Sequence, residues 1–86
     1  MELSDNQRKE LIKIVDNVFE EEELKTICLN NQQILHGNPY SKIQGNTVSS
    51  RLNYLVDYLI RKNSIQSFLE ILSKESEYFA SLLEDV

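Results

Sequence analysis

The chain of 86 residues has few of the residues that break helices or carry out chemistry. It has two glycines, one proline, one cysteine and one histidine, and no tryptophan. Two isolated glycines exclude the glycine-rich loops that bind phosphates and dinucleotides. A single cysteine excludes an intramolecular disulfide, and together with one histidine it cannot supply the four ligands of a structural zinc site. The composition therefore predicts neither a nucleotide-binding loop nor a zinc domain.

Basic residues are also in the minority. Nine Lys and Arg residues stand against fourteen Asp and Glu residues, which gives a net charge of −5. Polyanions repel such a chain on average, which argues against non-specific binding to nucleic acids or anionic membranes. No apolar run approaches the ~20 residues that span a bilayer, and the polar N-terminal residues do not form a signal peptide. We therefore expect a soluble, cytoplasmic protein without a nucleic-acid or membrane partner.

The two residues with nucleophile or base chemistry lie in unsuitable settings. Cys28 stands between Ile27 and Leu29, which is typical of a small buried hydrophobe in a reducing compartment. His36 belongs to a His-Gly-Asn-Pro segment and is predicted to be an exposed loop residue. Nothing in the sequence places these two residues together as a nucleophile and its base. We therefore predict a protein that is not an enzyme, with no catalytic residue, no metal ligand and no cofactor.

Apolar residues recur at helical spacing along almost the whole chain. No segment alternates apolar and polar residues over four or more positions, so no strand is predicted. The short connections between helices favour antiparallel neighbours. The expected fold is all-α, a compact antiparallel bundle of about six helices in one domain, residues 1–86. The predicted helical segments are approximately 4–19, 20–31, 32–35, 39–43, 47–62, one from 64 and one from 75.

Local signals indicate where several helices begin and end. Ser4 followed by Gln7 fits a capping box. Pro39 suits the first turn of a helix, because no N–H donor is needed there. Asn63 stands where a left-handed residue ends a helix, and Ser64 is predicted to cap the next one. Side chains predicted to face inward include Val48, Tyr78, Phe79, Leu82 and Leu83.

Charge and aromatic residues supply the candidate interface. Negative charge gathers where the first two helices meet, on Glu20, Glu21, Glu22 and Glu23. The 47–62 helix carries three cations and two tyrosines, namely Arg51, Tyr54, Tyr58, Arg61 and Lys62. If the two groups face different directions, the acidic group of one copy can dock on the basic group of another. The alternative is that these charges only keep the surface soluble.

The order of these features is similar to that of a known family. The matching pieces are Leu-Ser-Asp-Asn-Gln-Arg at 3–8, the acidic start of the second helix, and a loop-rich middle that ends at Gly45-Asn46. The most specific stretch is 48–69, which contains Leu-Val-Asp-Tyr and, further on, Asn-Ser-Ile-Gln-Ser-Phe-Leu. On these residues the chain resembles a bacterial effector-associated domain of the Death-like superfamily, the first-described class of that group. The resemblance covers about residues 3–72.

The resemblance implies a fold and a function. The fold would be a Death-fold-like Greek key of six antiparallel helices without catalytic residues. Such domains are fused to, or pair with, effectors such as proteases, TIR domains or NTPases in bacterial defence and signalling. Like-with-like contacts recruit or cluster those effectors. The expected function is therefore a non-enzymatic adaptor whose partner is a like domain, either in an effector or in a second copy as a homo-oligomer.

Two other functions stay open at this point. Residues 47–54, Thr-Val-Ser-Ser-Arg-Leu-Asn-Tyr, have the short polar side chains and the arginine of a helix-turn-helix segment that reads a DNA major groove. The acidic net charge opposes that function. A small acidic inhibitor that covers the basic surface of a partner would also agree with the composition.

Overall fold

The computed structural model describes residues 3–84, and within this range helices are joined by short irregular segments. It forms six α-helices and one 3-10 helix, with no strand in the described range. The predicted all-α bundle of about six helices is confirmed. The elements are α1 (Asp5–Val18), α2 (Glu21–Asn30), α3 (Gln32–Leu35), η1 (Pro39–Ser41), α4 (Val48–Arg61), α5 (Ile65–Glu75) and α6 (Glu77–Leu83).

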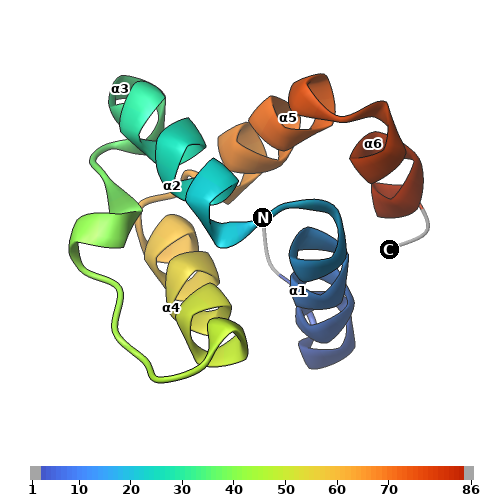
Figure 1. Ribbon diagram of the computed structural model, residues 1–86, viewed down its shortest axis with the longest axis horizontal. Helices are drawn as coiled ribbons and strands as arrows, with labels where there is room; N and C mark the ends of the chain where they lie inside the picture. The colour runs from blue at the N-terminus through green and yellow to red at the C-terminus, as the bar shows by residue number, and fades with distance from the viewer. Residues whose placement is uncertain (1–2, 85–86) are drawn as a thin grey trace.

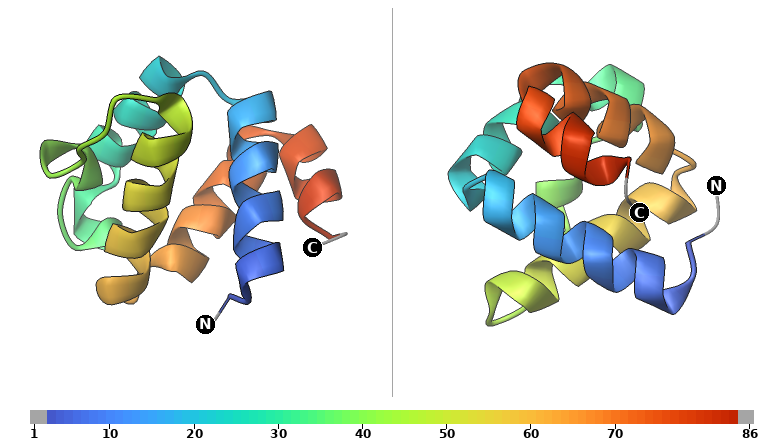
Figure 2. Two further views of the ribbon diagram at one scale, coloured as in Figure 1. Left: turned by 90° about the horizontal axis from the view of Figure 1, so that it is seen from below. Right: turned by 90° about the vertical axis from the view of Figure 1, so that its right-hand side faces the viewer.

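The helices pack around a common centre (Figures 1 and 2), where their buried side chains form one apolar core. Helix α1 contacts α4 and α6, while α5 contacts α3, α4 and α6. The buried side chains of these helices, together with those of α2, form one cluster. Its largest fully buried members include Phe68, Phe79, Leu11 and Leu59. Each such side chain stabilises the fold by roughly 1.5–3 kcal/mol relative to an exposed position, so this cluster fixes how the helix surfaces are presented.

The helix ends follow the local sequence signals in most places. The backbone N–H of Ser4 donates to Gln7 Oε1 at 3.0 Å, and the Gln7 N–H donates to Ser4 Oγ at 3.2 Å. This reciprocal pair confirms the predicted capping box. Thr47 Oγ1 accepts the Ser50 N–H at 3.1 Å and caps α4. Asn63 has a φ of 55°, which confirms the predicted left-handed residue after α4.

The predicted cap at Ser64 is wrong in its chemistry. Ser64 occupies the N-cap position of α5, but its side chain makes no capping hydrogen bond. Its hydroxyl donates instead toward the carbonyl oxygens of Leu35 at 3.2 Å and Lys62 at 3.1 Å. Ser64 is fully buried, so a hydroxyl without these acceptors would be costly. The residue therefore joins the start of α5 to the end of α3.

Two predicted inward side chains are exposed, and two predicted helix bounds have moved. Val48 is 38% exposed because it is the first residue of α4, and Tyr78 is 59% exposed on the outer face of α6. Phe79 faces inward as predicted, with its ring centroid 5.5 Å from that of Phe19. The helix expected at 39–43 is only the 3-10 turn η1, and α6 starts later than expected because Ser76 is extended and caps it.

Candidate protein-interaction surface

Aromatic and basic side chains lie on one side of α4, outside its fully buried stripe, although Tyr58 also packs against the edge of the core. Tyr54, Tyr58 and Arg61 follow one another at spacings of four and three residues, so they share one face of the helix. The opposite face is buried through Leu52, Leu55, Val56 and Leu59. The hydrophobic pattern of α4 therefore determines which of its side chains remain available to a partner.

This face forms one wall of a shallow concavity of about 530 Å³. The other wall comes from the segment between η1 and α4. We call this concavity the cationic surface, because it contains three cations and no acidic residue. It is lined by Lys42, Gln44, Tyr54, Tyr58, Arg61 and Lys62.

The two tyrosines of the cationic surface differ in burial and in contacts. Tyr58 is half-buried, and its hydroxyl lies against Gly37 so closely that a Cβ added there would be 2.7 Å from it. Lys62 Nζ lies 5.7 Å from the centroid of the Tyr58 ring, in a cation–π contact. Tyr54 is 39% exposed. Tyr58 is thus a fixed wall, whereas Tyr54 is free to pack against a partner.

No ion pair in the described part of the chain neutralises the charges of the cationic surface. Among residues 3–84, Lys42, Arg61 and Lys62 take part in none of the ion pairs. All three are exposed. Because the protein as a whole is acidic, this is a local reversal of the prevailing charge. Uncompensated charge of one sign in a concavity attracts a partner of the opposite sign.

Arg51, at the other end of α4, is already bound. Its Nε donates to Glu21 Oε2 at 2.6 Å and its Nη2 to Glu21 Oε1 at 2.9 Å, while Nη1 donates to the carbonyl of Gly45 at 3.3 Å. The hydrogen bond from Arg51 holds the pKa of the Glu21 carboxyl below its ordinary value. Two residues predicted for opposite surfaces are therefore joined in one chain, where they tie α2 to α4.

The other predicted glutamates remain at the surface. Glu20, Glu22 and Glu23 are exposed at the start of α2. Glu23 Oε1 accepts the backbone N–H of Glu20 at 3.0 Å, and Glu22 lies 3.3 Å from Lys25 Nζ. The predicted acidic group thus keeps three of its four members at the surface.

Sequence reasoning missed part of the cationic surface. Lys42 and Gln44 belong to the segment between η1 and α4, where no helical periodicity indicates which side chains face the same way. A second hollow of about 420 Å³ adjoins this surface and shares Tyr54 and Arg61 with it. It includes Arg8, whose Nη2 is 2.7 Å from an oxygen of the Asp57 carboxylate. The cation of Arg8 is thereby neutralised, and the free charge stays on the α4 side.

A comparison with known families places the chain. The family model for effector-associated domain 6 matches residues 3–76. The chain belongs to this family. The resemblance to effector-associated domains is thereby confirmed, although it was drawn to the first class and the match is to the sixth. No curated protein and no solved structure matches the chain. The matched range contains all the elements from α1 to α5, and α6 begins just after it.

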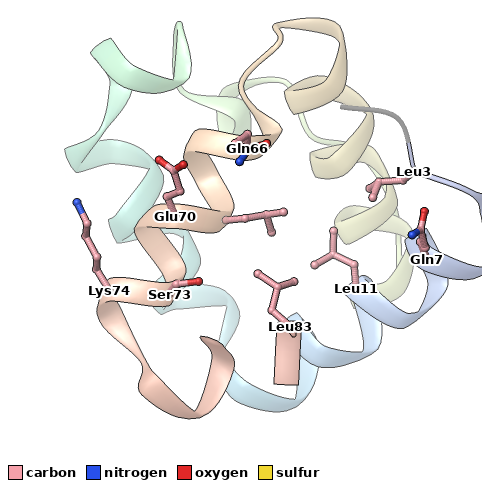
Figure 3. Close-up of a pocket in the computed structure, with 9 residues that line it drawn as sticks. Leu3, Gln7, Leu11, Gln66, Glu70, Ser73, Lys74 and Leu83 are labelled. Carbon is pink, nitrogen blue, oxygen red and sulfur yellow. The ribbon is translucent and has the colours of Figure 1, made fainter. Parts of the chain in front are cut away.

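This effector-associated domain also has an apolar groove on another face (Figure 3). The groove lies between α1, α5 and α6 and has a volume of about 450 Å³. Leu3, Leu11 and Leu83 point into it, and Leu69 also lines it. Sequence reasoning missed it because leucines at helical spacing indicate a filled core. Its rim carries one anion, Glu70, and one cation, Lys74, so the charge of the rim favours no partner. We call it the leucine groove.

The two residues with nucleophile or base chemistry differ in exposure. Cys28 is fully buried, as predicted, and burial raises the pKa of its thiol to about 12, so the thiol is protonated at neutral pH. Burial likewise raises the pKa of Tyr40. His36 is exposed, as predicted. In residues 3–84 no cluster of His, Cys, Asp and Glu is placed to hold a metal ion, and none of the helices has the length and apolarity needed to cross a bilayer.

Proposed function

We propose that this effector-associated domain is a non-enzymatic interaction module. It binds a like domain, in a second copy or in an effector such as a protease, a TIR protein or an NTPase. By that contact it recruits or clusters effectors in bacterial defence or signalling. The family supports the role of an effector-associated module. The observation that carries the proposal is the cationic surface, because its three free cations surround two tyrosines in a concavity without any acidic side chain.

The physical chemistry of this surface favours a protein partner with an acidic face. A single exposed ion pair is worth only ~0–1 kcal/mol, so one cation cannot provide specificity. Several charges that act together steer and orient the partner, and a tyrosine that becomes buried adds contact area. Lys42, Arg61 and Lys62 supply the charges, and the exposed Tyr54 supplies the anchor. We expect a contact that weakens as salt is added.

The DNA-binding alternative gains nothing from the structure. It requires Arg51 to reach base edges from the start of α4. The Nε and Nη2 groups of Arg51, however, already donate hydrogen bonds to the Glu21 carboxylate. Releasing Arg51 would break the contact that ties α2 to α4. The interaction surface at the other end of α4 has no such conflict.

The test reverses the charge of the surface. In Arg61→Glu with Lys62→Glu, the side chains stay exposed, so the fold should survive while the attraction becomes repulsion. Lys9→Glu with Lys13→Glu is the matched control, because it changes the net charge equally at exposed positions of α1. Association is measured by analytical ultracentrifugation across protein concentration at low and high salt. We expect the first variant to weaken association by about tenfold or more, and the control to leave it nearly unchanged.

Two results would overturn the proposal. One is a protein that stays monomeric at every concentration and salt level and does not bind an effector-associated domain added in excess. The other is association that is equally strong in the surface variant and in the control. Circular dichroism spectra that match the parent protein ensure that a loss of binding is not a loss of fold.

A further inference from the structure

A second concavity has the opposite charge from the cationic surface. It lies where the end of α1, the middle of α2 and the end of α5 meet, and it has a volume of about 280 Å³. Phe19 and Ile27 give it an apolar floor, while Glu23, Thr26 and Glu75 are exposed around it. We call it the acidic hollow. It includes one predicted glutamate, Glu23, and one residue that sequence reasoning did not select, Glu75.

The carboxylates of the acidic hollow are not neutralised. Among the described residues, neither Glu23 nor Glu75 is within an ion pair with a Lys or Arg side chain. The neighbouring Glu21 and Glu22, by contrast, are paired with Arg51 and Lys25. Glu23 and Glu75 therefore place unpaired negative charge over the hollow, and its apolar floor offers contact area beneath that charge.

The two concavities share no residue and cannot meet within one copy. The cationic surface is built by the segment before α4 and the end of α4, whereas the acidic hollow involves the end of α5. The left view of Figure 2 shows the segment before α4 at one side of the molecule and the junction of α5 with α6 toward the other. Because all these helices pack on one core, the distance between the concavities is fixed.

We infer that the acidic hollow is the partner of the cationic surface, supplied by a second copy of this chain. This inference rests on the proposed function and adds the surface to which the cations bind. Arg61 and Lys62 of one copy lie against Glu23 and Glu75 of the next, and Tyr54 covers the apolar floor. Charge complementarity supports this choice, since each surface carries unpaired charge of a single sign.

Such a contact has a direction. Each copy uses one surface and leaves the other free, so the contact is heterologous and adds further copies until a ring closes or a filament grows. The leucine groove is the competing docking site on this molecule. Its rim carries both Glu70 and Lys74, so it attracts neither a cationic nor an anionic partner in particular. The cationic surface and the acidic hollow are therefore favoured as the contact.

The directional contact can be tested with two half-interface variants. The first is Arg61→Glu with Lys62→Glu. The second is Thr26→Lys with Glu75→Lys, which leaves the capping hydrogen bond of Glu23 in place and puts a cation at the end of α5, where the helix dipole favours it. Gln66→Lys with Glu70→Lys is the control for the second, because it makes the same change of charge at the rim of the leucine groove.

Each half-interface variant should be monomeric by itself, with association weakened by about tenfold or more. Mixing the two should restore one junction, because the first keeps its acidic hollow and the second keeps its cationic surface. The smallest expected product is a one-to-one heterodimer, and alternating copies can add to it, because the glutamates at 61 and 62 of the first variant also attract the lysines at 26 and 75 of the second. Native mass spectrometry of isotopically labelled and unlabelled variants distinguishes this heterodimer from the two homodimers.

The other outcomes separate this inference from the proposed function. If only the first variant loses association, the cationic surface stands and the acidic hollow is wrong as its partner. If both lose association but the mixture stays monomeric, the heterologous pairing is wrong. If the Gln66→Lys with Glu70→Lys control loses association while the second variant keeps it, the contact lies at the leucine groove. If no variant loses association, the proposed function itself fails at this surface.

Discussion

Each end of α4 carries an arginine, but the two arginines have different roles. Arg51 near the start is held by two hydrogen bonds from its guanidinium to Glu21, whereas Arg61 near the end is exposed and unpaired among the described residues. The difference arises from what the fold places opposite each arginine. At the start of α4 a carboxylate from α2 lies within reach. At the end, Asp57 lines a hollow with Arg61 but is paired with Arg8, and the cationic surface itself contains no carboxylate. A charge is available to a partner only when the chain has not already neutralised it.

The largest effect on this comparison is expected from Gly37→Ala, which disturbs the free end of α4. Gly37 has a φ of 128°, a conformation that alanine adopts only with strain, and the added Cβ would lie 2.7 Å from the Tyr58 hydroxyl. We expect a loss of about 1–3 kcal/mol in the free energy of unfolding, measured by urea denaturation. Adding Tyr58→Phe should restore part of this loss, because it removes the clash but not the strain. No recovery in the double variant would mean that the tyrosine contact is not a source of the loss.

A smaller effect separates the two arginines directly. Arg51→Gln should lower the melting temperature, because it breaks the contact between α2 and α4, but it should leave self-association nearly unchanged. Arg61→Gln should do the reverse. Differential scanning calorimetry gives the melting temperature of each variant, and analytical ultracentrifugation gives its association. If the two substitutions have the same effect on both measurements, the distinction between the two ends of α4 is wrong.

The Glu21–Arg51 pair also predicts a dependence of stability on pH. The folded-state pKa of Glu21 lies below its ordinary value of 4.5, chiefly through the hydrogen bond from Arg51. The pair therefore stabilises the fold above about pH 4.5, and this contribution is lost as the pH falls through the lower folded-state pKa. The difference in melting temperature between the parent protein and Arg51→Gln should be constant from pH 8 to pH 6 and shrink toward pH 3. A difference that persists at pH 3 would show that Arg51 stabilises by packing rather than by charge.

The fold followed from the sequence because its signals are local and repeated. Apolar spacing predicted the helices, and Ser4 and Asn63 marked two of their ends with side-chain and backbone chemistry that depends on a few neighbours. The predictions that Val48 and Tyr78 face inward were wrong for a related reason. Both continue an apolar stripe, but each stands where no neighbouring element covers it, and coverage depends on the three-dimensional packing.

The candidate site could be predicted from the sequence only in part. Whether a side chain is free to bind a partner depends on residues far along the chain that the fold places beside it. Tyr54, Tyr58, Arg61 and Lys62 share one surface since helical spacing is regular, and the sequence predicted them as a group. The pairing of residues 21 and 51 joins positions thirty apart, and no local pattern contains that information. Lys42 and Glu75 entered the two charged surfaces for the same reason, through the packing of distant segments.

The smallest expected effect concerns Tyr40, which lies near the start of α4, where Arg51 binds Glu21. The hydroxyl of Tyr40 is buried without a hydrogen-bond partner among the described residues, in a region where Cys28, Glu21 and Arg51 influence its pKa. A buried hydroxyl without a partner destabilises the fold, so Tyr40→Phe should be neutral or raise the free energy of unfolding by up to ~1 kcal/mol. Urea denaturation measures the change, and Tyr54→Phe is the control, because its hydroxyl is on an exposed residue. A loss of ~1 kcal/mol or more in the free energy of unfolding of Tyr40→Phe would show that this hydroxyl has a partner, such as a bound water, and that this partner stabilises the fold near the start of α4.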